Sequence, residues 1–415
     1  MRKRIGIYNL HMSAGGGGEK RTVVMAEHLS RDHDVTLIVG EDGERRSLET
    51  YFGVDLSNVR ILPLDLPVQN PLRRLVESDR FPYLKSVRAD LFLMGLRRVL
   101  EPTYYPRLKR LNLDLFINNN GYSILPCPAS RGIYMCMFPI EMRGELRLDH
   151  TRGLLYRTYA LVGNRVVGMT RRVLDSYDII TANSSFTAEW TRKLWSVDAT
   201  VVYSACEPMG PPSPKENVIL HVGRFVGAGR NDDKHQHTLL EAFKRSKELL
   251  ARGWHLHLAG TVFTDANAKR TVDRLVESAR GYPVHFWFNA NFETLRRLYR
   301  SAAVYWHATG YGFRPEEHPG KQEHFGITTV EAMSAGAVPV VINTGGQRET
   351  VTHGVTGFLW NALDEMLSYT ERLARHAALC ADLSRNAIAA SARFSRSAFV
   401  DRMERLVTDL LCPCA

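Results

Sequence analysis

The sequence has few of the features that mark secreted, disulfide-rich or zinc-structured proteins. Its six cysteines are scattered, with no CxxC pair and no Cys/His cluster; they are Cys127, Cys136, Cys206, Cys380, Cys412 and Cys414. Neither a disulfide framework nor a structural zinc site is therefore predicted. We expect the thiols to be reduced, and we interpret the terminal CPCA segment as a loose tail.

Long apolar runs are also missing. The N-terminal stretch MRKRIGIYNLHMSAGGGGEK is too briefly apolar for a signal peptide or a membrane-spanning helix, so we expect a cytoplasmic protein. Low-complexity segments and short internal repeats are absent as well. The length of 415 residues, with 24% charged and 44% hydrophobic residues, predicts a soluble globular chain of two domains.

The net charge is +10, and most of the basic excess lies in the first half. There, residues 71–111 mix arginines with Leu, Phe, Tyr and Val. This pattern is typical of helices that rest on an anionic membrane surface or bind a phosphate-bearing acceptor, and equally of a solvated helical surface. Such charge also attracts nucleic acid, but we do not predict a nucleic acid partner.

Both halves repeat a strand, loop and helix pattern. In the first half, apolar strands are predicted at 4–10, 33–40, 113–120 and 177–185, with a glycine loop and a helix after the first strand. A proline-rich segment, ACEPMGPPSPKEN, then resists helix and strand. The pattern restarts at 217–225 with a strand, and HTLLEAFKRSKELLARG follows as one predicted helix. The sequence therefore predicts an α/β fold with buried parallel strands.

The predicted domains follow from this division. Residues 1–205 form an N-terminal Rossmann-like domain for the acceptor, 206–216 a linker and 217–394 a C-terminal Rossmann-like domain for a nucleotide sugar. Residues 395–415 form a final helix and tail, with the helix expected to cross back to the first domain. Two such domains facing each other leave a central cleft at the carboxyl ends of their strands, where this architecture binds ligands.

The glycine loop Gly15–Gly18 lies between the first strand and a helix, so bare backbone N–H groups face an anion there. As a dinucleotide fingerprint it is incomplete, because Lys20 stands where the third glycine belongs. Glu41 at the end of the next strand nevertheless keeps a nicotinamide-dependent dehydrogenase open as an alternative. A plain tight turn is the simpler interpretation.

The second half offers two cations near a strand end. Arg224 follows Gly223 directly after the strand, and Lys234 precedes the next helix. If a diphosphate leaves during the reaction, cations that bind its growing charge accelerate that step. An arginine or a lysine in a loop is more often part of the solvated surface. The hypothesis of diphosphate binding therefore depends on the position of these two residues after a strand.

The segment EHFGITTVEAM places two glutamates around a helix start. Gly326 permits a tight turn, Ile327 and Thr328 begin a helix with free N–H groups, and phosphate can dock on such a tip. Glu323 lies in the preceding loop and Glu331 in the helix. A carboxylate can accept from two neighbouring hydroxyls, so we predict Glu323 for the sugar and Glu331 for the ribose. The alternatives are that Glu323 only caps the helix and that Glu331 is a solvated acid on the helix surface.

These motifs resemble a known family. EHFGITTVEAMSAGAVPVV, GGQRETVTHGVTGFLW and HVGRF followed by a lysine are similar to the family 4 retaining glycosyltransferases of the GT-B class, over nearly the whole chain. ANSSFT and KLW most resemble α-1,2-mannosyltransferases that use GDP-mannose and a dolichol-linked acceptor, and their bacterial relatives. The resemblance implies a metal-independent hexosyltransferase that takes a GDP-sugar, or a UDP-sugar, as substrate and needs no cofactor.

The resemblance also implies roles for individual residues. It places Gly16, Gly17 and Gly18 at the donor phosphates, Arg224 and Lys234 on the diphosphate and Glu323 on the transferred sugar, as catalytic residues. Backbone contacts to the donor are implied for Gly223, Phe325, Gly326, Ile327 and Thr328, and a ribose contact for Glu331. Partners are a nucleotide-sugar donor and a glycan, polysaccharide precursor or lipid-linked acceptor, with peripheral membrane association through the basic first domain.

Two positions depart from the simplest expectation. Met137 stands where many relatives place a histidine near the sugar, which leaves the donor identity open. The string DHD at 32–34 matches a manganese-binding D-x-D, but it lies between the first helix and the second strand, at the wrong edge of the sheet. A nucleotide-sugar epimerase and a non-catalytic nucleotide-sugar-binding protein remain alternatives to the transferase.

Overall fold

The computed structural model describes residues 2–12, 17–40, 44–64, 100–121, 123–139, 172–227, 233–263 and 266–412. Several sequence predictions fall on positions outside the described residues, namely Gly15, Gly16, Glu41, residues 71–99 of the basic segment, and Cys414. The chain divides into two compact units. The first comprises Met1–Asn183, Thr187–Val202 and Phe399–Ala415; the second comprises Ser184–Phe186 and Tyr203–Ala398.

The first unit is built on one parallel sheet. Its strands, in spatial order, are β3 (Arg60–Pro63), β2 (Asp34–Val39), β1 (Arg4–Asn9), β4 (Leu115–Asn118), β5 (Arg131–Cys136), β6 (Ile179–Ala182) and β7 (Thr200–Val201). The register pairs Ile5 of β1 with both Val35 of β2 and Leu115 of β4. The strand order therefore reverses between β1 and β4, which is the switch point at which doubly wound sheets bind ligands.

The second unit repeats this arrangement. Its parallel strands, in spatial order, are β10 (Val284–Phe288), β9 (His255–Gly260), β8 (Glu216–Val222), β11 (Ala302–His307), β12 (Val338–Ile342) and β13 (Phe358–Trp360). Here the order reverses between β8 and β11. Both sheets thus have the Rossmann order, and each has one switch point at the carboxyl ends of its central strands.

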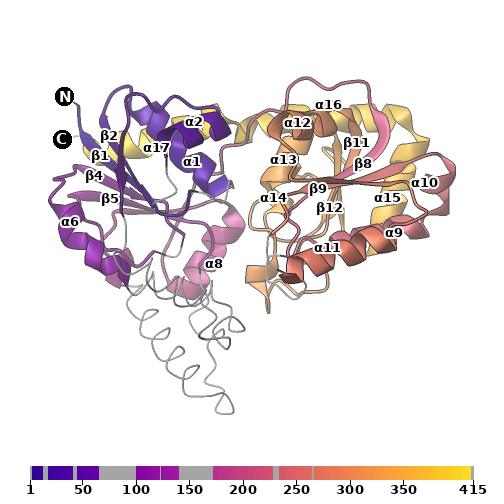
Figure 1. The fold of residues 1–415 in the computed structure, drawn as a ribbon, viewed down its shortest axis with the longest axis horizontal. Coiled ribbons are helices and arrows are strands. Elements are labelled where there is room, and N and C mark those ends of the chain that lie inside the picture. The colour runs from indigo at the N-terminus through magenta and orange to yellow at the C-terminus, as the bar shows by residue number, and fades with distance from the viewer. Residues whose placement is uncertain are drawn as a thin grey trace, which may run out of the picture. The chain divides into compact units, whose positions relative to one another are not determined.

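Helices cover both faces of each sheet (Figure 1). In the first unit these are α1 (Gly17–Leu29), α2 (Arg45–Phe52), η1 (Glu101–Tyr104), α6 (Tyr105–Lys109) and α8 (Ser185–Trp195). In the second they are α9 (Gln236–Arg245), α10 (Lys247–Ala251), α11 (Ala266–Ser278), α12 (Phe292–Ser301), η2 (Pro319–Lys321), α13 (Ile327–Ser334), α14 (Gln347–Thr350), α15 (Leu363–Arg375), α16 (Ala377–Ser391) and η3 (Ala392–Phe394).

The last helix, α17 (Arg396–Leu411), belongs mostly to the first unit, because residues Phe399–Ala415 group with that unit by their contacts. The sequence predicts such a return for this helix. Its buried side chains recur at helical spacing, at Phe399, Met403, Leu406 and Val407. That apolar stripe is what docks an amphipathic helix onto a core.

Two apolar layers enclose the sheet of the second unit. On one face, Leu239, Leu249 and Met366 from α9, α10 and α15 join the core around Trp306 and Trp360. On the other, a separate cluster takes its members from α12, α13 and α16, including Leu298, Met333 and Ala387. Figure 1 shows these two sets of helices on opposite sides of the sheet. Strands buried on both faces explain the nearly continuous apolar runs in the sequence.

One predicted element is divided. The segment HTLLEAFKRSKELLARG forms α9 and α10 rather than one helix, and the break falls at Ser246. Ser246 has extended backbone angles, and its hydroxyl accepts a hydrogen bond from the Leu249 backbone N–H as the N-cap of α10. Serine competes well for this capping position, so the single-helix prediction was wrong there. No described helix is both long and apolar enough to cross a membrane.

Candidate active site

The switch point of the second sheet gathers most of the residues singled out from the sequence. Strand β8 ends at Val222 and is followed by Gly223 and Arg224, whereas β11 ends at His307. The loop after β11 carries Glu323, and Lys234 lies just before α9. These segments are distant in sequence but converge at one edge of the sheet, where ligands of this fold bind.

An ion pair lies at the centre of this site. The Nζ atom of Lys234 is 2.8 Å from Oε2 of Glu323, and each side chain is 19% exposed. The Nε2 atom of His307 is 3.2 Å from the same carboxylate oxygen. The structure therefore brings together Lys234 and Glu323, which the sequence assigned to one site, and adds His307, which the sequence analysis missed.

The ion pair sets the charge of Glu323. Burial by itself would raise the pKa of this carboxyl group, but the Lys234 ammonium and the His307 hydrogen bond outweigh it and hold the pKa well below its ordinary value of 4.5. Burial lowers the pKa of His307, which Glu323 only partly offsets. At neutral pH Glu323 is thus ionised and His307 is a neutral imidazole.

Two glycines fix the backbone that carries Glu323. The N–H of Gly346 donates to the carbonyl oxygen of Glu323 at 2.8 Å. A Cβ atom on Gly345 would lie 2.2 Å from that same oxygen, and Gly345 has a φ of +57°. Any larger side chain would push the two loops apart. The GGQRE motif therefore supports the glutamate loop, a role that its sequence alone did not show.

The helix tip predicted from EHFGITTVEAM is present. Gly326 caps α13 with φ 96° and ψ 57°, a left-handed conformation that favours glycine. The Thr328 hydroxyl is held by the phenol of Tyr305, which donates to it at 2.7 Å. Because the first N–H groups of a helix lack intrahelical acceptors, Ile327 and Thr328 present donors at this tip.

Glu331 lies within α13, half-buried. The phenol of Tyr299 in α12 donates a hydrogen bond to its Oε2 at 3.0 Å. Burial raises the pKa of Tyr299, and the neighbouring Glu331 charge raises it further. The carboxylate is thus held in one orientation by a phenol that remains protonated. Phe325, next to Gly326, is buried in an apolar cluster with Cys206, Val330 and Phe394.

The backbone after β8 is held in place by hydrogen bonds and by close packing of glycines. The Gln236 amide donates to the carbonyl oxygens of Gly223 and Arg224, at 3.2 and 3.0 Å. Gly260 approaches so closely that a Cβ there would lie 2.0 Å from the Gly223 oxygen. The exposed Arg224 guanidinium lies 5.7 Å from the centre of the Phe263 ring. The Arg224 guanidinium is therefore accessible to a ligand from solvent.

In the first unit, two of the three glycines predicted to face the donor phosphates, Gly17 and Gly18, begin α1. The carbonyl oxygen of Gly18 accepts hydrogen bonds from the Asn119 amide at 2.8 Å and from the Thr22 hydroxyl at 3.0 Å. A Cβ on Gly18 would be 3.1 Å from the sulfur of Met137. Met137 therefore lies against Gly18, and the place near the sugar that the resemblance implies for it stays a prediction. Gly17 is half-buried, and the donor contacts of this loop remain predictions.

Behind this loop lies a buried polar network. Glu101 is 2% exposed, and its carboxylate accepts from the Tyr8 phenol, the Ser123 hydroxyl, the Asn120 amide and the Ile124 backbone N–H, at 2.7 to 3.0 Å. Burial raises the pKa of Glu101 in spite of these four donors. The network ties the carboxyl ends of β1 and β4 together, so its polar groups already have structural partners.

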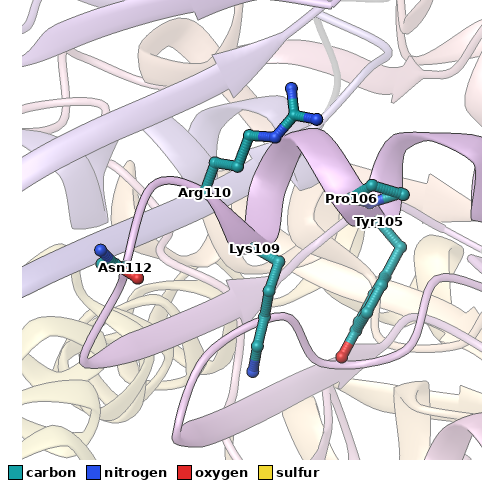
Figure 2. A pocket seen from close by; sticks show the side chains of 5 residues that line it. All are labelled: Tyr105, Pro106, Lys109, Arg110 and Asn112. Atoms are coloured by element: carbon teal, nitrogen blue, oxygen red, sulfur yellow. The ribbon is translucent and has the colours of Figure 1, made fainter.

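A hollow elsewhere on the first unit is lined by Tyr105, Pro106, Lys109, Arg110 and Asn112. In Figure 2, Tyr105 and Lys109 extend to one side of α6 and Arg110 extends to the other. The two cations therefore do not converge on one point. This hollow lacks the paired cations that a diphosphate requires, although its rim is basic.

The DHD string lies at the amino end of β2, as the sequence predicts. Strand β2 begins at Asp34, whose carboxylate pairs with the Arg2 guanidinium at 2.8 Å. Ligand sites of doubly wound sheets lie at the opposite, carboxyl edge. Asp34 is thus part of a surface ion pair at the edge that these folds do not use for ligands.

Comparisons with known proteins show which families the chain resembles. Residues 209–389 match the family model described as Glycosyl transferases group 1. The chain is 23% identical over 404 residues to the GDP-Man:Man(3)GlcNAc(2)-PP-Dol alpha-1,2-mannosyltransferase of Xenopus laevis, an alignment that covers 88% of this chain and 78% of the relative. The enzyme of the same name from Dictyostelium discoideum is 26% identical over 256 residues, covering 56% of this chain and 47% of that protein.

Solved structures share the fold over its whole length. The sucrose-phosphate synthase of Thermosynechococcus elongatus superposes with a TM-score of 0.66 at 16% identity, covering 99% of this chain and 100% of that one. Anabaena HepE in complex with UDP and glucose gives a TM-score of 0.64 at 16% identity, covering 98% and 100%. At such low identity these likenesses establish the fold, which is the two-domain α/β GT-B fold.

Proposed function

We propose that this chain, which matches the Glycosyl transferases group 1 model over residues 209–389 and has the GT-B fold, is a glycosyltransferase that transfers a hexose, mannose, from GDP-mannose to a glycan or lipid-linked acceptor. The transfer retains the anomeric configuration and needs no metal. The Lys234–Glu323 ion pair is the observation that carries this proposal. In this proposal Lys234 binds a donor phosphate and Glu323, 2.8 Å away, binds a hydroxyl of the sugar on the other side of the glycosyl phosphate bond.

The diphosphate side of the site is built from positive charge. Lys234 and Arg224 contact the leaving diphosphate, and the tip of α13 supplies backbone N–H groups to its oxygens. As the bond to the sugar breaks, charge grows on the leaving oxygen, and contacts that strengthen with that charge lower the barrier. These residues supply the charge that a divalent cation would otherwise bring, which supports metal-independent transfer.

The sugar side depends on Glu323. Both of its hydrogen bonds within the described residues fall on Oε2, so the carboxylate has further acceptor capacity for the hydroxyls of the hexose. Its low pKa keeps it ionised at neutral pH. A carboxylate already paired with a lysine and a histidine is a weak nucleophile, which argues against a covalent glycosyl intermediate of the kind that retaining glycosidases form.

The acceptor hydroxyl then attacks from the face that the diphosphate leaves. In this scheme the departing phosphate oxygen takes the proton of the acceptor, and the sugar passes through an oxocarbenium-like state. Glu331, oriented by Tyr299, accepts from the ribose hydroxyls of the donor. The mannosyltransferase relatives support GDP-mannose over other donors. Met137, at the position where the resemblance leads us to expect a histidine, leaves the identity of the sugar to be tested.

The acceptor belongs to the first unit in this proposal. The described end of the basic segment carries Arg107, Lys109 and Arg110, all exposed on or just after α6. Exposed cations of this kind attract phosphate-bearing lipids or anionic glycans at the cytoplasmic face of a membrane. Sedimentation with vesicles that contain anionic lipid tests this part, and a Lys109→Ala/Arg110→Ala variant is expected to sediment less.

Release of the nucleoside diphosphate tests the central proposal. GDP-mannose and UDP-glucose are incubated with the chain and a lipid-linked or glycan acceptor, with and without EDTA, and the product anomer is assigned by NMR. Arg224→Ala and Lys234→Ala are each expected to lower turnover by about 10²–10³. Lys269→Ala, an exposed lysine of α11, is the matched control. Full turnover in Arg224→Ala, or an epimer formed without acceptor, contradicts the assignment.

A further inference from the structure

Three histidines form a compact cluster on the sheet of the second unit, apart from the ion pair. His255 and His257 belong to β9 and His285 to β10, and their ligand nitrogens all lie within 4.8 Å of one another. The β-strand period of two puts His255 and His257 on the same face, and the register sets His285 directly beside His257. Sequence spacing alone hides the cluster, because 28 positions separate His257 from His285.

The ring nitrogens point toward a common place. Nδ1 of His255 and Nε2 of His285 are 3.0 Å apart, and the His257 and His285 rings meet edge to face with centroids at 4.8 Å. Nδ1 of His257 is buried and has no hydrogen-bond partner among the described residues. A buried polar atom without a partner is costly, so a ligand there would satisfy it.

We propose that His255, His257 and His285 bind a divalent transition-metal ion of the zinc type. Zinc takes imidazole nitrogens at 2.0–2.1 Å, and three histidines with an open fourth position form a known coordination set. Tetrahedral coordination at that bond length needs nitrogens about 3.4 Å apart. The nitrogens here already lie within 4.8 Å of one another, so small rotations of the rings complete the site.

One charge opposes a metal ion at this cluster. The Arg297 guanidinium lies 5.6 Å from the centre of the Trp287 ring, and that ring lies 5.8 Å from the ring of His257. A cation this close to the cluster weakens the binding of a second cation.

The cluster is separate from the proposed active site. His255 pairs with Val218, four residues before the carboxyl end of β8 at Val222, which is roughly 13 Å along the strand. β10 is the edge strand of its sheet, and unpaired edges are weak points of a sheet. A metal held by both strands would join this edge to β9, so its expected role is to stabilise the unit rather than to take part in transfer.

Titration of the metal-stripped, full-length chain with Zn²⁺ tests this proposal, with heat and melting temperature as readouts. We expect one site that raises the melting temperature. His257→Gln and His285→Gln are each expected to weaken Zn²⁺ binding by at least about tenfold. His285 is exposed, so its variant should fold normally, which circular dichroism checks. Arg297→Gln, which removes the opposing charge, is expected to tighten binding by a few fold.

Two controls separate this site from others. His376→Gln changes an exposed histidine outside the cluster and is expected to bind Zn²⁺ like the unchanged chain. Cys412→Ser/Cys414→Ser removes the terminal thiols and is expected to keep the site. Unchanged Zn²⁺ affinity in His285→Gln, or loss of binding in the cysteine variant, overturns the proposal. Glycosyl transfer need not change in any of these variants, so failure here leaves the proposed activity standing.

Discussion

The two units carry the same sheet order but use the polar groups at their switch points differently. In the first unit, Glu101 is surrounded by four donors that all come from the protein. In the second, Glu323 shares one oxygen between Lys234 and His307 and stays partly exposed. A buried, fully bonded carboxylate stabilises a fold, whereas a partly exposed carboxylate beside a cation can exchange its partners for a ligand.

The opposite pKa shifts of the two glutamates support this distinction. Burial raises the pKa of Glu101, while Lys234 and His307 overcome the effect of burial and lower the pKa of Glu323. Repetition of a fold therefore does not repeat its chemistry. The comparison predicts that changes at Glu323 affect turnover and that changes at Glu101 affect stability.

Glu323→Gln should give the largest effect. The change keeps the size of the side chain but removes the charge that pairs with Lys234, so turnover is expected to fall by about 10²–10³. Steady-state kinetics with the preferred donor measure it. Glu277→Gln, an exposed glutamate of α11, is the matched control and should behave as the unchanged chain. Equal turnover in Glu323→Gln would remove Glu323 from the site.

Glu101→Ala tests the other side of the comparison. Removing the carboxylate leaves four buried donors without their acceptor, which should lower the free energy of unfolding by on the order of 3 kcal/mol. Urea denaturation measures this, and Glu189→Ala, an exposed residue of α8, should change it by less than about 0.5 kcal/mol. If Glu101→Ala lowered turnover without lowering stability, the switch points of both units would have to take part in the reaction, which would contradict the comparison.

Gly326→Ala addresses the helix tip. A side chain at φ 96° is strained, and its Cβ would lie 2.8 Å from the Gln347 amide, so stability should fall by about 1–3 kcal/mol and the donor KM should rise. Gly253→Ala is a matched control, because Gly253 also has a positive φ, of 70°, but no atom within 4 Å of its Cβ position. If the two variants show equal donor KM, the tip does not bind the donor.

The smallest expected effect is a difference in pH dependence. Glu323 contributes stability above the ordinary pKa of 4.5, and this is lost as the pH falls toward its lowered pKa. Glu101 acts in the opposite direction: its folded state binds more protons, so stability falls as the pH rises from 4.5 through its raised pKa. Unfolding free energies measured across this range should flatten below 4.5 in Glu323→Gln and above 4.5 in Glu101→Gln.

Several local features followed from sequence patterns. Apolar runs predicted β1, β2, β4, β6 and β8, whereas β3, β5 and β13 were not predicted. The prediction of one continuous helix failed at Ser246. Its hydroxyl caps a new helix there, and such a local hydrogen bond leaves no trace in the hydrophobic periodicity. His307, Gly345 and Gly346 were missed, since their contacts with the Glu323 loop join segments that are 16 to 23 residues apart.

The amino-acid sequence by itself determined the two-domain α/β architecture and pointed to Arg224, Lys234, Glu323 and Glu331 as candidate binding residues, because hydrophobic period, glycine position and charge are local properties. Only the tertiary structure decided that Lys234 and Glu323 form an ion pair, that Glu101 is buried among donors, and that three histidines of β9 and β10 meet. These depend on strand register and loop packing, which bring distant residues within a few ångströms and thereby set their charge and partners.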